Sequence, residues 1–306
     1  MKYPQLKNFR IIAIAVICLH GCSTTSPAHD SDDAISELSG ENIDLLFATE
    51  FPVASKDEAL MKAAKAYRAG ELDKAQFFLV SALTFDSGDA DVLVKIGNLH
   101  VQKDDGLLAA RAFQYALQQS PRHAAALEGM GLLYFKVGND AEAQKHLESA
   151  LESGARLWRS HNALGVIADR QKKFDIAQSH YDTAIEMQPM ADAVLINRGY
   201  SNYLNKNYLL AELDFRAVVE RADSDKAWRN LGLVYAAQGW YEDALETFLQ
   251  VGEERDAYNA TGEIAMENGD IEEALYFLTE AVRLSPRYFA LAEKNLDQLQ
   301  KKSSRE

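Results

Sequence analysis

The sequence has few cysteines, no long apolar run and fewer basic than acidic residues. Cys18 and Cys22 are its only cysteines in 306 residues. No stretch of 18 or more residues is continuously apolar, so we predict no permanent membrane span. Its 32 Lys and Arg face 46 Asp and Glu, for a formal net charge of -14. A nucleic-acid-binding surface needs a basic footprint, which this balance argues against.

The motifs of common catalytic sites are also missing. The sequence contains no H-E-x-x-H, no G-x-x-x-x-G-K-[ST] and no G-x-S-x-G. His146 and His180 suggest a shared metal site, because they take the same place in two successive helical units of the sequence. Packed helices are about 8–10 Å apart, however, so surface or packing roles are the better interpretation. We therefore expect no enzyme, no bound metal and no cofactor.

The amino terminus is typical of an export signal that ends at a cysteine. Basic residues precede nine apolar residues from Ile11 to Leu19, as in secretory signal peptides. The next residues, up to Cys22, resemble the lipobox of bacterial lipoproteins, although His20 is unusual within that box. The resemblance implies removal of residues 1–21 and attachment of acyl chains to Cys22. A plain export signal with an incidental cysteine is the alternative.

The mature chain would begin with a tether, residues 22–55, rich in Ser, Thr, Asp and Pro. Cys22 would be its only thiol, so no disulfide can form within it. Ser23, by resemblance to sorting in enterobacterial lipoproteins, favours the periplasmic face of the outer membrane. The apolar segment Ile43–Phe47 would either cap the helices that follow or dock a partner.

A helical repeat organises the rest of the chain. Residues Trp228 to Phe248 read WRNLGLVYAAQGWYEDALETF, with W-x2-L-G-x2-Y followed by A-x3-F. This pattern resembles the tetratricopeptide repeat (TPR), two helices joined by a turn. Gly232 and Ala244 lack side-chain bulk where the two helices would approach closely. Gly239 would end the first helix, because glycine adopts the left-handed conformation at little cost.

Three residue registers repeat along the chain. Alanine recurs at nearly equal intervals, glycine keeps phase with it, and a large apolar residue follows each alanine one helical turn later. We therefore predict an all-α TPR solenoid of about seven repeats, followed by a capping helix and tail at 289–306. Val251 to Glu254 should shorten the second helix of repeat six. The repeats span 56–89, 90–123, 124–157, 158–191, 192–224, 225–254 and 255–288, with alanines 75, 109, 143, 177, 211, 244 and 274.

The TPR resemblance implies that the first helix of each repeat lines an inner groove. In repeats three to six this groove would carry five basic residues and three aromatic residues, in a chain of negative net charge. Arginine pairs with carboxylates, and tyrosine offers apolar area together with a hydroxyl. We therefore expect a protein client with acidic and apolar side chains. The predicted groove residues are Phe135, Lys136, Arg159, Asn162, Arg170, Asn197, Tyr200, Tyr203, Lys226, Arg229 and Asn230.

Several of these residues have a second interpretation. Arg159 and Lys226 are equally typical of solvated charges at helix ends, which contribute little. Tyr200 and Tyr203 would alternatively pack between neighbouring repeats. Both interpretations stay open at the level of sequence.

The asparagines of the groove favour one kind of client. Asn197 and Asn230 occupy a position where TPR proteins that bind extended peptides commonly hydrogen-bond the ligand backbone. Asn162 and Val166 stand where chaperone-binding TPR domains have a lysine and an asparagine. We therefore do not expect a carboxylate clamp for a chaperone tail.

Further motifs resemble one family of lipoproteins. A lipobox, a tether and several repeats are joined by N-R-G-Y at Asn197–Tyr200, by N-L-G-L-x-Y-A-x-Q-G at Asn230–Gly239 and by S-P-R-Y-x-A-x-A-x-x-N-L at Ser285–Leu296. Together they resemble the TadD lipoproteins of tight-adherence (Tad, Flp) pilus systems. The resemblance implies a non-catalytic adaptor, anchored to the outer membrane, that binds a pilus or secretin component. A type IV pilus or secretin pilotin and an envelope scaffold that docks a cell-wall hydrolase are the alternatives. We expect the protein to bind neither nucleic acid nor a small-molecule substrate.

Overall fold

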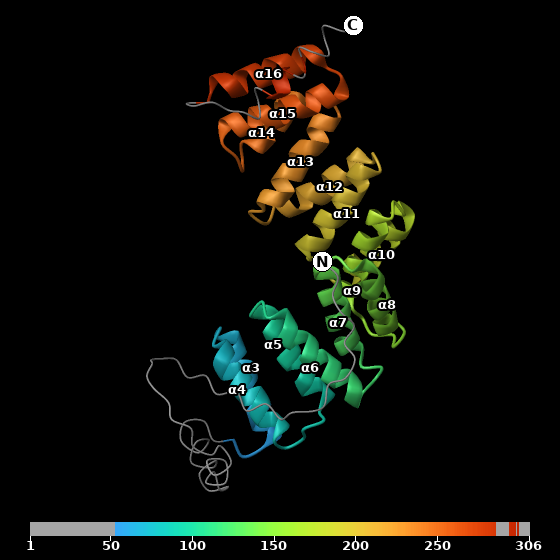
Figure 1. Ribbon diagram of the computed structural model, residues 1–306. Helices are drawn as coiled ribbons and strands as arrows, with labels where there is room; N and C mark the ends of the chain where they lie inside the picture. The colour runs from blue at the N-terminus through green and yellow to red at the C-terminus, as the bar shows by residue number, and fades with distance from the viewer. Residues whose placement is uncertain (1–52, 286–293, 298, 300–306) are drawn as a thin grey trace, which may run out of the picture. The chain divides into compact units, whose positions relative to one another are not determined.

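The computed structural model is helical through the part of the chain that it describes, and those residues contain no strand. Figure 1 follows its helices from α3 to α16, in chain order. The predicted signal peptide 1–21, Cys22, the Ile43–Phe47 segment and most of the tether lie outside the described residues. The described residues are 53–285, 294–297 and 299.

The described helices form consecutive pairs, each made of a first and a second helix joined by a short turn. Each helix contacts its partner in the pair, and each second helix contacts the first helix of the next pair. This confirms the predicted solenoid of helical hairpins. The pairs are α3 (Lys56–Arg68) with α4 (Leu72–Leu83), α5 (Ala90–Gln102) with α6 (Gly106–Gln119), α7 (Ala124–Lys136) with α8 (Asp140–Leu151), α9 (Trp158–Arg170) with α10 (Phe174–Met187), α11 (Asp192–Leu204) with α12 (Tyr208–Val219), α13 (Asp225–Ala237) with α14 (Tyr241–Phe248), and α15 (Glu254–Asn268) with α16 (Ile271–Arg283).

A glycine of the first helix packs on a large side chain of the second helix in each of the last six pairs. A Cβ atom added to Gly232 would lie 2.6 Å from the Phe248 ring, and one on Gly165 would lie 2.5 Å from Tyr181. Real side chains do not approach so closely, so any other residue here would push the pair apart. The constant spacing between the glycine and the large residue therefore marks where the two helices touch. The remaining contacts join Gly97 to Phe113, Gly131 to Leu147, Gly199 to Phe215 and Gly262 to Leu278.

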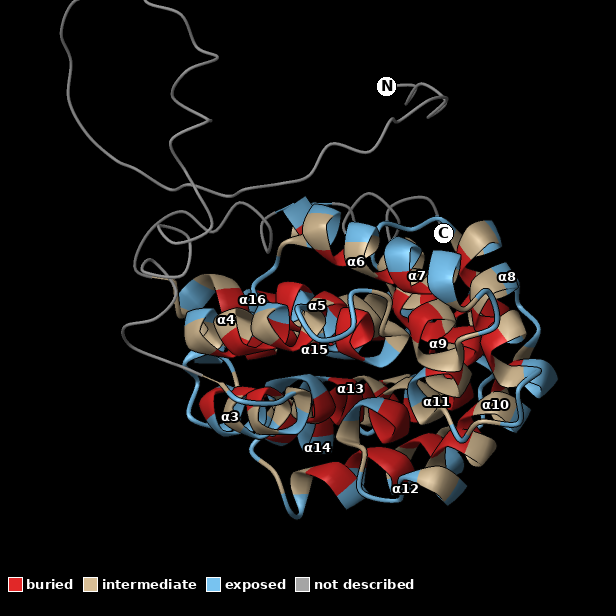
Figure 2. Cartoon of the chain, turned by 90° about the horizontal axis from the view of Figure 1, so that it is seen from below, coloured by how far each residue is buried: buried red, intermediate tan, exposed pale blue. Residues whose placement is uncertain are grey.

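The core runs from pair to pair. One cluster combines Leu195 of α11, Phe215 of α12 and Leu231 of α13, so a pair buries its apolar face only with the help of its neighbour. Figure 2 shows the buried residues on the sides of the helices that meet, with exposed residues along the outer sides. The seven register alanines 75, 109, 143, 177, 211, 244 and 274 are all 0% exposed.

The turn inside each pair needs one residue in the left-handed conformation. Gly239 has φ 80°, which confirms the predicted end of α13. Lys172 and Lys206 adopt the same conformation with φ of 59° and 62°, although a Cβ atom makes it strained. The other residues at this position are Gly70, Asp104, Gly138 and Gly269.

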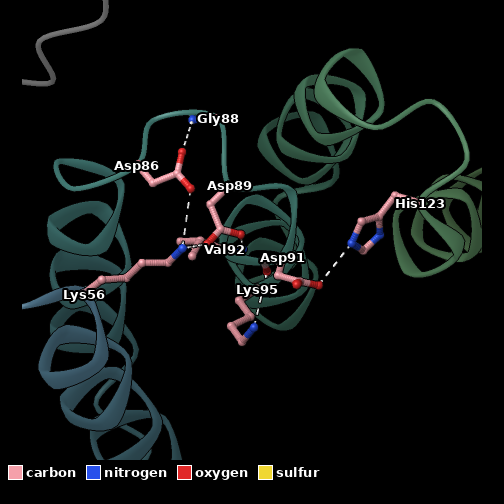
Figure 3. A network of polar contacts seen from close by, with 8 residues as sticks. All are labelled: Lys56, Asp86, Gly88, Asp89, Asp91, Val92, Lys95 and His123. Atoms are coloured by element: carbon pink, nitrogen blue, oxygen red, sulfur yellow. Dashed lines mark hydrogen bonds and ion pairs between the residues drawn. The ribbon is translucent and has the colours of Figure 1, made fainter.

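Polar side chains connect the starts of the first helices, as Figure 3 shows for α3, α5 and α7. The Asp89 carboxylate caps α5 and forms an ion pair with Lys56 at the start of α3. His123 caps α7 by accepting a hydrogen bond at Nδ1, and its Nε2 lies 3.0 Å from Asp91 Oδ1. Because Nδ1 accepts, the ring proton sits on Nε2 and is donated to Asp91. These contacts fix the register of neighbouring pairs.

The last pair is covered by the described residues that follow α16. Residues 294–297 and 299 are helical, and Leu299 is 1% exposed in a cluster with Phe277. Asn295 Nδ2 donates to Asn259 Oδ1 at 3.2 Å and to Glu263 Oε1 at 2.6 Å. The apolar end of the array is therefore shielded from water, as a terminal repeat requires.

Candidate protein-binding face

The first helices of successive pairs contact one another directly. Helix α5 contacts α7, α7 contacts α9, α9 contacts α11, α11 contacts α13, and α13 contacts α15. No two second helices of the described chain make comparable contacts. The first helices thus form one side of the array, which we call the first-helix face. All eleven predicted groove residues lie on these helices.

Arg159, at the start of α9, faces a buried acid of the preceding repeat. Its Nη2 lies 3.1 Å from Oε2 of Glu128, which is only 4% exposed. Ser160 donates its hydroxyl to the other oxygen of the same carboxylate at 3.1 Å. Arg159 is therefore more than a solvated helix-end charge, because it compensates a charge that burial would otherwise destabilise.

Two more predicted cations are paired with acids that are not buried. Lys136 Nζ lies 2.5 Å from Asp104 Oδ1, and Arg170 Nη1 lies 2.5 Å from Asp140 Oδ1. Both acids belong to the preceding repeat, Asp104 in its turn and Asp140 at the start of its second helix. The Arg170 guanidinium also stacks 4.9 Å from the centroid of the Phe135 ring. The predicted excess of positive charge is thus largely neutralised in repeats three and four.

Between α9 and α11 the polar groups satisfy one another. Asn197 Nδ2 donates to Asn162 Oδ1 at 3.0 Å. The Asp169 carboxylate accepts from the Ser201 hydroxyl at 2.6 Å and from the Tyr181 hydroxyl at 2.7 Å. Burial raises the pKa of Asp169, while both hydrogen bonds favour its charged form. This part of the face is a closed network that holds repeats four and five together.

The structure contains a buried ion pair at α11 that was not predicted from the sequence. Arg198 donates from Nε and Nη2 to both oxygens of Asp214, at 3.0 and 2.6 Å, and from Nη1 to Asp182 at 2.7 Å. Burial raises the pKa of Asp214, which is 4% exposed, and the guanidinium opposes that shift. A signal was available, because Arg198 and Asp214 directly precede the contacting Gly199 and Phe215 and keep the same spacing.

Tyrosines gather at the end of α11. The rings of Tyr200 and Tyr203 stack with centroids 5.9 Å apart, and Tyr203 meets Tyr208 at 6.0 Å. Tyr200 remains 43% exposed and Tyr203 is half-buried. The pair thus combines packing between neighbours with an exposed aromatic surface, which suits contact with a partner.

Repeat six differs in charge. Lys226 and Arg229 of α13 are exposed, and neither has a carboxylate within 4.0 Å among the described residues. Arg229 Nη2 donates to the backbone oxygen of Val251 at 3.5 Å. Two of the five predicted cations are therefore available to an acidic partner.

An open cavity of about 630 Å³ lies beside Arg229, between α13 and α15. The helix α14 has 8 residues, which confirms the predicted shortening, and the turn that follows it forms one wall. Asn230 lines the cavity at 9% exposure, and its Nδ2 has no hydrogen-bond partner among the described residues. The lining residues are Arg229, Asn230, Leu233, Phe248, Val251, Gly252, Asp256, Ala257, Asn259 and Ala260.

His146 and His180, considered above for a shared metal site, each contact another group of the helix pairs. His146 Nδ1 lies 2.9 Å from the Glu142 carbonyl oxygen, and His180 Nδ1 lies 3.1 Å from Nδ1 of His161. Burial lowers the pKa of both His161 and His180, so both rings are neutral near pH 7. Within the described residues no three His, Cys, Asp or Glu side chains are grouped as metal ligands would be.

In the same part of the chain, no helix has the length and apolar character that a bilayer crossing needs.

The sequence profile of the tetratricopeptide repeat matches residues 94–161, 162–227 and 241–288, together more than half of the chain. The protein therefore belongs to the tetratricopeptide repeat family. Members of this family are generally non-catalytic scaffolds that bind other proteins.

Individual relatives and solved structures are similar to this chain at low identity. The tetratricopeptide repeat-containing protein trd-1 of Caenorhabditis elegans is 28% identical over 110 residues, which are 35% of this chain and only 14% of that protein. The crystal structure of PilW, a widely conserved type IV pilus biogenesis factor, is 16% identical with a TM-score of 0.53, and covers 69% of this chain and 98% of PilW. The structure of pilF from Pseudomonas aeruginosa is 18% identical with a TM-score of 0.52, and covers 70% of this chain and 97% of pilF.

Proposed function

We propose that the protein is a TadD-like adaptor lipoprotein that holds a segment of a pilus or secretin component on its first-helix face. The observation that carries the proposal is the change along this face. The predicted cations and asparagines of repeats three to five have partners within the chain, whereas Lys226 and Arg229 of repeat six have no acidic partner among the described residues, and Arg229 borders an open cavity. An acidic and apolar client segment would satisfy both features.

The comparisons give this proposal a first client to test. PilW is a type IV pilus biogenesis factor by name, and its structure has the same fold. At identities of 16% and 18% that likeness concerns the fold alone. The pilus client therefore rests on the TadD resemblance of the sequence motifs, and the structural neighbours make it the reasonable choice for the first experiment.

Membrane attachment in this proposal depends on Cys22. Acyl chains on its thiol and on the new amino terminus anchor a protein firmly, since each buried methylene contributes about 0.8 kcal/mol. We expect Cys22→Ser to move the protein from the outer-membrane fraction to the soluble periplasmic fraction. The measurement is immunoblotting of separated membranes, and a variant still in the membrane would rule out lipid as the anchor.

Client binding is tested by capture from detergent-solubilised membranes. The variant combines Tyr200→Ala, Lys226→Glu and Arg229→Glu, and should recover pilus and secretin proteins at less than a tenth of the wild-type amount. All three side chains are exposed, so the thermal unfolding midpoint should stay within about 2 °C of wild type, given the small cost of surface substitutions. Mass spectrometry identifies the captured proteins.

A matched control changes charge on the second helices. Arg111→Glu with Lys145→Glu alters the same number of cations on α6 and α8, which lie outside the first-helix face. This control should capture the client as wild type does. Equal loss in both variants would show that net charge matters and the face does not. Recovery of cell-wall hydrolases without pilus proteins would favour the scaffold alternative.

A further inference from the structure

We propose that the outer side of α12 binds the same helix of a second copy of this chain, in antiparallel orientation, and so forms a dimer. The proposed function assigns no role to the second helices, so this inference goes beyond it. The starting observation is a group of exposed leucines: Leu209 is 70% exposed, Leu210 48% and Leu213 58%. Leu209 and Leu210 each lie one helical turn before Leu213, so the three form one apolar patch.

The other second helices show that the fold does not require leucine at these places. The three leucines stand two and one positions before the register alanine of repeat five and two positions after it. At the same places α14 carries Glu242, Asp243 and Glu246, and in α8 two of the three residues are charged. An exposed apolar patch that the hairpin itself does not need indicates contact with another molecule.

The two ends of α12 carry opposite charges. Lys206 lies in the turn just before the helix and has no carboxylate within 4.0 Å among the described residues. Glu220 caps the other end, remains exposed and lies 3.9 Å from Arg216. The patch of leucines is therefore bordered by a cation on one side and an anion on the other.

These charges determine the orientation of the second copy. A twofold axis through the middle of an antiparallel pair brings Lys206 of each copy to Glu220 of the other. A parallel pairing would place Lys206 beside Lys206 and Glu220 beside Glu220, and like charges oppose such contact. The antiparallel pairing is therefore the one that satisfies both ends.

The side chains between the ends are also complementary to themselves. Leu213 lies midway between Lys206 and Glu220, so it falls at the twofold axis. Leu209 of one copy then faces the exposed Ala217 of the other, where the small side chain leaves room for it. Leu210 faces Arg216, whose aliphatic stem covers an apolar neighbour while its charged head stays in water.

The balance of charge on this surface allows two acidic chains to approach. The formal net charge of the whole chain is -14, so two copies repel one another in general. On the outer side of α12, Lys206 and Arg216 offset Glu220 and the partly buried Glu212. Since one helix of each copy takes part, the interface is small and transient. We expect a dissociation constant on the order of 10 μM.

The test is sedimentation velocity of residues 22–306 with Cys22→Ser, which removes acyl chains and thiols as sources of association. Concentrations from tenfold below to tenfold above the expected dissociation constant should show a reversible dimer. Leu209→Glu and Leu213→Glu should each weaken it at least tenfold, or about 1.4 kcal/mol, because a carboxylate is buried without a partner. Both sites are exposed in the single chain, so the thermal unfolding midpoint should stay within about 2 °C.

The matched control is Leu107→Glu on α6. Leu107 takes the same place in repeat two as Leu209 in repeat five and is 65% exposed. The control therefore adds the same charge and removes the same side chain outside the proposed interface, and it should dimerise as wild type does. Equal loss in both variants would show that exposed leucines or net charge in general drive association, and would overturn the proposal.

Exchanging the end charges tests the orientation. Lys206→Glu and Glu220→Lys should each weaken the dimer about threefold, because like charges then meet at both ends. The double variant restores opposite charges and should dimerise as wild type does. Single variants without effect, or a double variant without rescue, overturn the antiparallel pairing.

Two further outcomes also decide the question. A chain that stays monomeric at every concentration overturns the proposal. If that monomer captures a membrane protein that Leu209→Glu fails to capture, the patch belongs to another protein. Client capture is a separate matter, since the variant with Tyr200→Ala, Lys226→Glu and Arg229→Glu is changed on first helices alone and should still dimerise.

Discussion

The junction between repeats four and five differs from the junction between repeats six and seven, although both are built from the same helical hairpin. Between α9 and α11, Asn197 bonds to Asn162, and Ser201 bonds to Asp169. Between α13 and α15 a cavity remains, and Asn230 lines it with a donor that no described residue satisfies. One junction therefore satisfies its polar groups from within the chain, whereas the other leaves a polar group to be satisfied by something else.

The contrast shows how a repeat array separates stability from binding. The registers that hold each pair together, such as Gly199 on Phe215 and Gly232 on Phe248, are the same in both regions. What differs are side chains that reach the neighbouring first helix, among them those two and three positions before the glycine. Ile196, at the position that Asn162 holds in repeat four, gives Asn230 no side-chain acceptor on α11, while the contact of Gly232 with Phe248 is kept.

The largest effect should come from removing Arg198 of repeat five, which pairs with the buried Asp214 of α12 and with Asp182 of α10. Arg198→Met leaves the buried Asp214 carboxylate without its bidentate partner, and we expect a loss of about 3 kcal/mol in the free energy of unfolding. Urea unfolding followed by circular dichroism measures it. The same change at Arg229, which contacts one backbone oxygen at 3.5 Å, should cost less than about 0.5 kcal/mol. Similar losses at the two arginines would contradict the contrast between the regions.

Replacing each of two equivalent asparagines by leucine should change the free energy of unfolding differently. Asn197→Leu removes the hydrogen bond to Asn162 and should destabilise the fold by about 1 kcal/mol. Asn230→Leu removes a buried donor without a partner, so it should leave stability unchanged or raise it by up to about 1 kcal/mol. Paired denaturation curves of the two variants give the comparison directly. If Asn230→Leu destabilised the protein as much as Asn197→Leu, the amide would have to be satisfied already in the free protein.

The fold could be predicted from the sequence because its determinants recur in phase. Alanine, glycine and a large residue repeat together, and the structure buries every register alanine at 0% exposure. The helix that carries each candidate groove residue follows from the same registers. Such local patterns specify a hairpin, and stacking of hairpins specifies the array.

The electrostatics of the site could not be predicted in the same way. Lys136 pairs with Asp104 and Arg170 pairs with Asp140. Both acids belong to the preceding repeat, in its turn or at the start of its second helix, and lie outside the three registers. Whether a cation is free therefore depends on a side chain of the preceding repeat. The missing partner of Asn230 has the same origin, since it depends on the residue at position 196.

The smallest effect concerns the turn inside the pair, where the two regions again differ. Lys172 and Lys206 hold the left-handed conformation in repeats four and five, whereas Gly239 and Gly269 hold it in repeats six and seven. A residue with a Cβ atom in the left-handed conformation destabilises the fold by about 1–2 kcal/mol. Glycine avoids this strain, but part of the gain is lost because glycine has more conformational freedom in the unfolded chain. Lys172→Gly and Lys206→Gly should therefore each stabilise the protein by about 0.5–1 kcal/mol.

The reverse change completes this test of the turn. Gly239→Ala imposes the strain that the lysines carry and should destabilise by about 1 kcal/mol, although open space surrounds the added Cβ. Asp104→Gly should gain less than the lysine variants, since aspartate tolerates the left-handed region better. Urea midpoints of the four variants rank the effects. A gain at Asp104 larger than at Lys172 would show that contacts of these side chains, and not backbone strain, decide the stability of the turn.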